Sequence, residues 1–199
     1  MATVFQFIQD GKLTPTKVLS QDIASLNKIF GIASESAELK EGGISLTVIE
    51  AVERMIEISS NYAAYLLTYT VKVTPITNML RTLGLDDSRM SGEPYTTVKD
   101  IVIFYEKLYK GQIVSPTASK EMIEILKKQT LNDRIPKYLP ENTVIAHKTG
   151  ELDGVKHNAG IVYSPKGDYI IVLFSDTDLP LHAAEIEAQI SKKAWDYFN

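Results

Sequence analysis

The spacing of apolar residues changes near residue 143, and this change restricts the fold more than any other feature of the sequence. Before it, apolar residues recur three and four positions apart, as in amphipathic helices. After it, short apolar runs alternate with turn residues, a pattern typical of strands, and the short links between runs favour antiparallel pairing. We therefore predict an α+β fold in a single domain over 1–199. A mainly helical lobe occupies about 1–142, and a sheet with a C-terminal helix occupies about 143–199.

Helix-start signals divide the first part of the chain. Thr47 and Glu50 have the spacing of a capping box, in which each side chain binds the other residue's backbone N–H. Thr74 and Ser115 each precede a proline, which favours the first helical position. Residues 12–44 are polar and poorly periodic, so we expect a long surface excursion there. Helices are expected at 2–10, from 47, from about 59–61, at 74–84, at 97–111, at 115–128 and from 180, and strands at 144–149, 159–163 and 169–175.

Composition excludes several classes of protein. The 199 residues contain no cysteine, which rules out disulfides, thiolate catalysis and cysteine zinc sites. The net charge of −4 argues against a dedicated nucleic-acid-binding protein, and no apolar run is long enough to span a membrane. The three histidines, His147, His157 and His182, lack the spacing of zinc ligands. We expect no metal, no cofactor, no nucleic-acid partner and no membrane span.

A short motif on the first expected strand, Lys148-Thr149-Gly150, suits an extended anionic ligand. The Thr149 hydroxyl can donate to a carboxylate, and the Lys148 ammonium raises the local positive potential. Gly150 has no Cβ, so a ligand backbone can approach and pair with the strand edge. The backbone N–H of Glu151 could point at a developing oxyanion. The alternative is that Lys148 is simply a solvated strand residue.

A second motif, Ser59-Ser60-Asn61, lies at an expected helix start. If Ser59 faced Lys148, the ammonium would favour a polarised hydroxyl able to pass a proton. Asn61 offers a carbonyl and an amide to a peptide-like group of a ligand. The alternative is that Ser59 only caps the helix that begins there.

Together the ordered motifs resemble the serine β-lactamase and penicillin-binding protein family, and most closely its class A β-lactamase type. The flanking segments 10–14, 45–50 and 158–162 are similar as well, so the resemblance covers essentially the whole chain. It implies a β-lactamase/transpeptidase-like fold and a serine hydrolase that acts on β-lactams or D-alanyl peptides through an acyl-enzyme. The implied catalytic residues are Ser59, as a proton shuttle to the leaving nitrogen, and Lys148, as the electrostatic group. The implied ligand-binding residues are Asn61, Thr149, Gly150 and Glu151.

Two departures from the family pattern bear on activity. The nucleophile of the family lies in Ser-x-x-Lys, which would fall just before Met1, so we expect an N-terminally truncated representative that is inactive alone. The Ser-x-x-Lys at 25–28 lies beyond the first helix and is interpreted as coincidental. The segment 86–95 lacks the family's Glu-x-x-Leu-Asn, and Glu93 is its only glutamate.

Two alternatives to a hydrolase stay open. One is a non-catalytic module that binds β-lactams or the peptides of cell-wall peptidoglycan, and the other is a truncated gene product with no independent role. The expected partner is a small-molecule β-lactam or a peptidoglycan peptide. An open sheet edge predicts a homo-oligomer formed by strand pairing. The resemblance suggests a secreted or extracytoplasmic protein, although the residues themselves do not assign a compartment.

Overall fold

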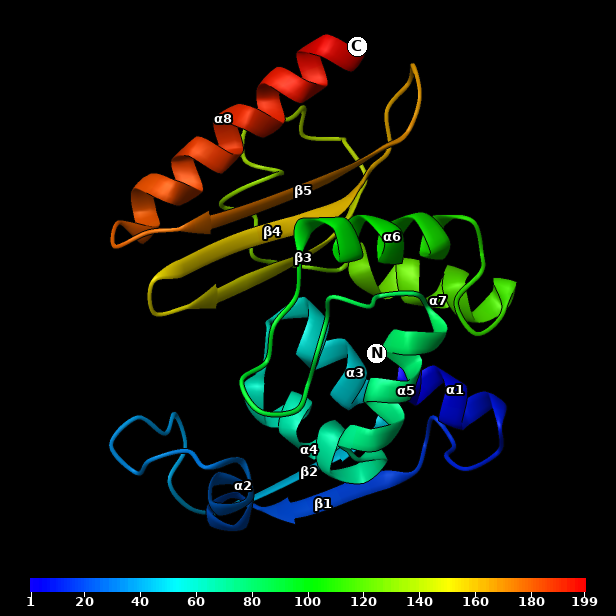
Figure 1. Cartoon of the computed structure of the whole chain (residues 1–199), viewed down its shortest axis with the longest axis vertical. Coiled ribbons are helices and arrows are strands. Elements are labelled where there is room, and N and C mark those ends of the chain that lie inside the picture. The colour runs from blue at the N-terminus through cyan, green and yellow to red at the C-terminus, as the bar shows by residue number, and fades with distance from the viewer. The chain divides into compact units, whose positions relative to one another are not determined.

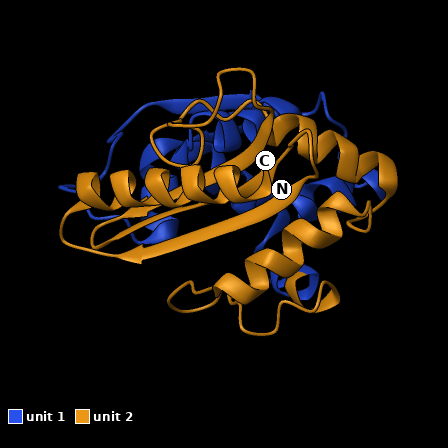
Figure 2. Ribbon diagram, turned by 90° about the horizontal axis from the view of Figure 1, so that it is seen from above, with its two compact units in different colours: residues 1–79 blue, residues 80–199 orange.

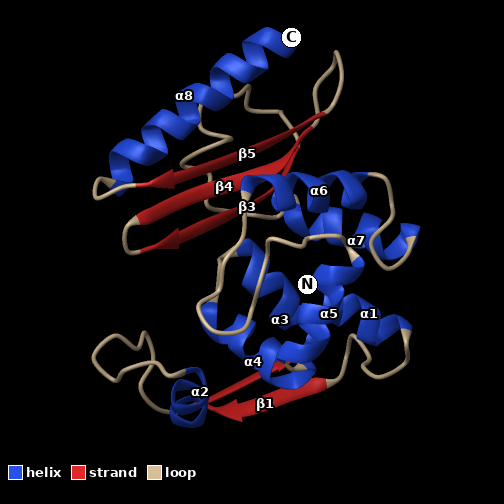
Figure 3. Ribbon diagram, in the orientation of Figure 1, coloured by secondary structure: helices blue, strands red, loops and turns tan.

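The computed structural model describes residues 1–199 and divides them into two compact units, 1–79 and 80–199 (Figure 2). Each unit combines helices with an antiparallel sheet, which confirms the predicted α+β class (Figure 3). The predicted change from helices to strands near residue 143 falls inside the second unit. The grouping of both units into one domain stays a prediction.

The first unit holds more strand structure than expected. Strand β1 pairs with β2 in antiparallel register, from Val18 opposite Thr47 to Asp22 opposite Gly43. The helix between them is capped by Asp22, whose carboxylate accepts from the N–H of Ser25 at 2.8 Å. The segment 12–44, expected as a long surface excursion, therefore contains two regular elements, β1 and α2, and the start of β2. The elements are α1 (Ala2–Gln9), β1 (Val18–Asp22), α2 (Ile23–Phe30), β2 (Gly43–Thr47), α3 (Val48–Glu57) and α4 (Asn61–Val71), with α5 (Val73–Thr82) crossing into the second unit.

Local signals explain the helices of this unit. The capping box is confirmed, since Glu50 N–H donates to the Thr47 hydroxyl at 3.3 Å and Thr47 N–H donates to the Glu50 carboxylate at 2.8 Å. Helix α4 packs against α2 through Tyr62, which is buried against Ile23 and Leu26. The Tyr62 hydroxyl donates toward Asn27 Oδ1, at 2.8 Å, so the buried phenol is satisfied.

The second unit is built around a three-stranded sheet in the order β3-β4-β5 (Figure 1). All neighbours are antiparallel, and Lys148 of β3 lies opposite Ala159 of β4. Strands β3 and β4 are joined by the two-residue turn at 153–154, where Gly154 has a φ of 79°, a left-handed conformation that favours glycine. The remaining elements are α6 (Val98–Tyr109), α7 (Pro116–Leu126), β3 (Ile145–Leu152), β4 (Val155–Val162), β5 (Tyr169–Asp176) and α8 (Pro180–Phe198).

Helices cover the sheet of the second unit. Trp195 of α8 packs on a buried cluster that includes Ile145, Val162 and Ile171, one residue from each strand. Helices α6 and α7 also contact the strands, and the Tyr105 hydroxyl of α6 donates to the Ala159 carbonyl at 2.9 Å. The sheet is therefore packed against helices, and β3 and β5 are its edge strands.

Candidate active site

The Lys148-Thr149-Gly150 motif lies on β3, an edge strand of the second unit's sheet. Because successive side chains of a strand point to opposite faces, Thr149 and Glu151 share one face and Lys148 and Gly150 the other. Thr149 is buried, while Lys148 is half-buried and donates from Nζ to the Thr149 carbonyl at 2.7 Å. An edge strand leaves its outer backbone groups available for pairing, as the sequence-based hypothesis of a ligand along β3 requires.

The environment of Lys148 makes its ammonium unusually acidic. Burial lowers the pKa of Lys148 from 10.5 to about 8, and the guanidinium of Arg134 lowers it further in the same direction. Neutral pH therefore lies only about one unit below the pKa of this ammonium. Such a group can both attract an anion and give up or accept a proton, two roles that the interpretation as a solvated residue would not need.

The glycine of the motif is not required by packing. A Cβ on Gly150 would lie 3.5 Å from the His157 Cβ, which is an ordinary van der Waals contact. At Gly160 on β4, in contrast, a Cβ would lie 2.6 Å from the Cβ of His147 and 2.7 Å from the Ala146 carbonyl oxygen. The fold thus explains Gly160, whereas Gly150 calls for another reason, such as close approach of a ligand backbone.

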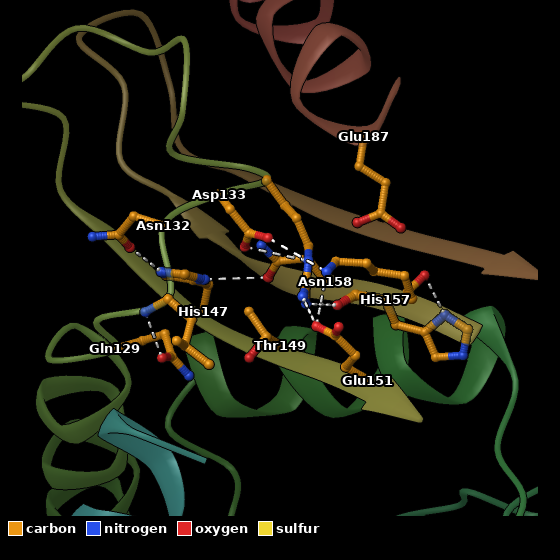
Figure 4. A network of polar contacts seen from close by, with 12 residues as sticks. Gln129, Asn132, Asp133, His147, Thr149, Glu151, His157, Asn158 and Glu187 are labelled. Carbon is orange, nitrogen blue, oxygen red and sulfur yellow. Dashed lines mark hydrogen bonds and ion pairs between the residues drawn. The ribbon is translucent and has the colours of Figure 1, made fainter. Parts of the chain in front are cut away.

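The side chain of Glu151 takes part in an ionic network that sequence reasoning missed (Figure 4). Its carboxylate accepts from the guanidinium of Arg134, and the Nζ of Lys156 lies 2.9 Å away. Asp133 contacts the same two cations at 3.4 and 3.6 Å. Arg134 and Lys156 are 1% and 4% exposed, so these carboxylates are needed to compensate buried positive charge. These contacts hold the pKa of Glu151 below its ordinary value, with the Lys156 hydrogen bond as the main cause.

Two further titratable side chains, His147 and Glu187, lie close to this network. Buried His147 contacts Asn158 through Nδ1 and Asn132 through Nε2, both at 3.2 Å. Burial lowers the pKa of His147 to about 4, so its imidazole is neutral at physiological pH. On α8, Glu187 is buried beside the same cations, and burial raises its pKa to about 7. His147 is therefore a polar core residue.

The serine motif lies in the first unit, between α3 and α4. Ser60, and not Ser59, caps α4, because the Ser60 hydroxyl accepts from the N–H of Ala63 at 3.3 Å. The alternative that Ser59 is the cap was wrong. Ser59 is half-buried and has a φ of 55°, a left-handed conformation that costs a non-glycine residue about 1–3 kcal/mol. Backbone strain of this kind occurs preferentially at functional sites.

Asn61, the first residue of α4, is exposed, and its amide donates to the Glu38 carboxylate at 2.8 Å. Its carbonyl and amide are thus presented at the surface of the first unit, and binding a ligand through the amide would require exchange with Glu38. Ser59 and Asn61 belong to a different unit from Lys148 and Thr149. The meeting of the two motifs across one crevice stays a prediction.

No group of three or more His, Cys, Asp or Glu side chains is arranged to hold a metal ion. No helix combines the length and apolar character that crossing a bilayer requires.

Several solved structures share the fold of this chain. A β-lactamase from Sphaerobacter thermophilus has a similar structure, with a TM-score of 0.86 at 25% identity, over 99% of this chain and 79% of that chain. A β-lactamase from Chitinophaga pinensis gives a TM-score of 0.83 at 21% identity, over 100% and 82%. A mutant PBP-A, solved as an acyl-enzyme complex with penicillin G, gives 0.81 at 20% identity, over 99% and 77%.

None of the curated protein sequences compared with the chain matches it. The sequence model of a family described as "Beta-lactamase enzyme family" matches residues 1–198, nearly the full length of the chain. With its α+β units and the Lys148-Thr149-Gly150 motif on an edge strand, the chain belongs to the β-lactamase enzyme family.

Proposed function

We propose that this chain carries the ligand-holding part of a serine hydrolase site for β-lactams or D-alanyl peptides. The observation that carries the proposal is the motif on β3. It combines an ammonium of lowered pKa at Lys148 with Gly150, a glycine that packing does not require. Family membership and a neighbour that holds penicillin G as an acyl-enzyme support the β-lactam as ligand.

Each residue has a defined part in this proposal. The Thr149 hydroxyl donates to the carboxylate of the ligand, and the Lys148 ammonium sets the local electrostatic potential. Gly150 has no Cβ, so the ligand backbone can approach the edge of β3. The N–H of Glu151 donates to the carbonyl oxygen under attack. Ser59 passes a proton to the leaving nitrogen, and Asn61 binds the amide side arm of the ligand.

We further propose that no serine among residues 1–199 is acylated. The Ser-x-x-Lys of this chain begins at Ser25 in the first turn of α2, where both Ser25 and Lys28 are exposed. An exposed pair on a helix surface lacks the enclosed, water-excluding setting in which a hydroxyl is activated. This observation favours the second candidate function, a non-catalytic module that binds β-lactams or peptidoglycan peptides.

Two experiments separate the hydrolase from the binding module. The chain is incubated with a fluorescent penicillin and run on a denaturing gel, and no labelled band is expected. A covalent band would show that one of its own serines is a nucleophile. Calorimetric titration with benzylpenicillin and with a D-alanyl-D-alanine peptide then tests binding. The expected result is saturable heat that is lost in Lys148→Ala and kept in Lys192→Ala, since Lys192 is a lysine of α8 whose side chain is 43% exposed.

The other edge of the sheet suggests a partner. Strand β5 has a run of uncharged residues from Tyr169 to Ser175, without the charges or prolines that protect edge strands. We propose that β5 pairs with β5 of a second copy. Analytical ultracentrifugation of the wild type and of Val172→Lys tests this, and a monomer at all concentrations for the wild type would contradict it.

A further inference from the structure

A cavity of about 350 Å³ lies between strand β5 and helix α8. This volume is at the lower end of the range for small-molecule sites. Apolar side chains of both elements form much of its wall, among them Leu173, Phe174, Ile186 and Ile190. Its polar residues include Ser175 and Glu187. No residue of the β3 motif lines the cavity, so it does not belong to the candidate active site.

Glu187 brings to this cavity a buried carboxylate with one oxygen that accepts no hydrogen bond. The residue is 3% exposed and extends from α8 toward the sheet (Figure 4). Its Oε1 lies 3.0 Å from the hydroxyl of Ser175, which also donates to the carbonyl oxygen of Lys156. Because a hydroxyl has one proton, Ser175 cannot donate fully to both oxygens. Oε2 is buried without a partner, so a donor placed beside Glu187 would remove an unfavourable unpaired acceptor.

The charges around Glu187 leave its own charge uncompensated. The neighbouring ion pairs balance, because two cations meet two carboxylates among Arg134, Lys156, Asp133 and Glu151. Glu151, Lys156 and Ser175 are paired on neighbouring strands, so their side chains share the face that α8 covers. The Lys148 ammonium lies on the other face, since Lys148 is three residues from Glu151 along β3. Ionised Glu187 therefore gives the α8 face one excess negative charge.

The rest of the lining also suits a positive charge. No lysine or arginine lines the cavity, and its second carboxylate is that of Asp176, at the end of β5. His182 is the only basic side chain of the lining, and it is exposed. Burial raises the pKa of Glu187 to about 7, against the hydrogen bond from Ser175 and the nearby cations, so the ionised form is present at neutral pH. A cation bound beside Glu187 would favour that form.

We infer that this cavity is a binding site for a small organic cation, an amine whose ammonium donates to Glu187 and whose apolar body packs between β5 and α8. The ammonium supplies the donor that Oε2 lacks and neutralises the excess negative charge. The apolar body covers Ile186 and Ile190, which are 43% and 44% exposed. A neutral alcohol of the same shape can make the hydrogen bond but not the ion pair, and an anion is repelled by both carboxylates. The site goes beyond the proposed function, because none of the residues assigned to β-lactam binding takes part.

Three probes with the same ring and different charge test this site, namely phenethylamine, phenethyl alcohol and hydrocinnamate. Their affinities are measured by calorimetric titration on both sides of the Glu187 pKa of about 7. The protein is kept in the concentration range where sedimentation shows a monomer, so that a second copy at β5 does not block the cavity. Above this pH, we expect the amine to bind about tenfold more tightly than the alcohol, and hydrocinnamate not to bind. Equal affinities for amine and alcohol would overturn the proposal.

Variants of α8 locate the binding. Glu187→Gln keeps the shape of the side chain and removes its charge, so the amine should bind about tenfold more weakly while the alcohol is unaffected. Glu185→Gln is the matched control, because it makes the same charge change at a residue that pairs with Lys137 and does not line the cavity. Ile186→Trp is the second variant in case Glu187→Gln folds poorly. It fills the cavity from a partly exposed position and should weaken binding of amine and alcohol alike.

The same titrations distinguish this site from a general effect of charge. Amine affinity of the wild type should rise with pH as Glu187 ionises, and this rise should be absent in Glu187→Gln. A rise that persisted in Glu187→Gln would assign the effect to another group, such as His182, and would overturn the role of Glu187. An equal loss of amine affinity in Glu185→Gln, or none in Ile186→Trp, would likewise refute the site. No probe is a β-lactam or a peptide, so either result leaves the proposed function to its own test.

Discussion

Replacing Gly160 with alanine should destabilise the second unit strongly, because two strands lie unusually close at this point. The added Cβ would lie 2.6 Å from the Cβ and 2.9 Å from the Cα of His147, and 2.7 Å from the Ala146 carbonyl oxygen. The Cα and the carbonyl belong to the backbone of β3, so no side-chain rotation removes the overlap. Strands β3 and β4 would have to separate along the hydrogen-bonded ladder that carries Lys148.

The magnitude follows from the cost of overpacking. Inserting a methyl group into a filled site costs about 1–3 kcal/mol, and backbone overlap puts Gly160→Ala at about 3 kcal/mol. For a chain of this size, that corresponds to a fall in melting temperature of about 6–12 °C. Trp195 is the only tryptophan and packs on the core of the second unit, so its fluorescence during guanidinium or thermal unfolding reports on the relevant part.

Gly150→Ala is the matched control for the same experiment. Its Cβ would make only ordinary contacts, at 3.5 and 3.8 Å from His157, so we expect a loss of less than about 1 kcal/mol. The two substitutions should therefore separate stability from ligand binding, with Gly150→Ala folded but impaired in binding. An unfolding midpoint for Gly160→Ala equal to that of the wild type would refute the steric argument.

Three further predictions concern single side chains. Lys148→Met should stabilise the second unit by about 2–3 kcal/mol at pH 7. The folded-state pKa of Lys148 is lowered to about 8, so the unfolded chain binds more protons than the folded chain between pH 8 and 10.5. The stability of the wild type therefore rises over this range, and the advantage of methionine disappears. Equal pH profiles of unfolding for the two proteins would contradict this. Tyr105→Phe should cost about 1 kcal/mol through loss of the hydrogen bond to the Ala159 carbonyl, measured by Trp195 fluorescence. Ser60→Ala should lower the stability of the first unit by about 1 kcal/mol through loss of the α4 cap, and circular dichroism showing no change would argue against the cap.

Local signals were sufficient for much of the fold. The capping box at Thr47 and Glu50 predicted the start of α3, and the apolar run after Tyr169 predicted β5. The pair β1 and β2 was missed because each strand is only five residues long and contributes a single buried apolar residue, Leu19 or Leu46. Its cross-strand contacts also include Ser20 and Ser45, whose hydroxyl oxygens lie 2.7 Å apart, so the pattern is too short and too mixed to predict a strand.

The site was predictable only in part. The motif on β3 could be found because its three residues are contiguous in sequence. The ionic network could not, because Arg134, Glu151 and Lys156 come from three segments that meet only in the folded sheet. Lys156 was further hidden by the expectation that the second strand begins at 159, whereas β4 begins at Val155. Buried charges break the rule that interior positions are apolar, so a pattern of hydrophobicity cannot reveal them.

The tight turn between β3 and β4 has a consequence for how such a sheet can diversify. With only two residues joining the strands, their alignment is fixed, and each side chain of one hairpin arm has an assigned neighbour on the other. Slippage by a single position would send Lys156 to the opposite surface and remove the counter-charge of Glu151 in the same step. Insertions here should therefore be tolerated only as bulges outside the ladder, so the length of this connection is constrained by the pairing of the two strands.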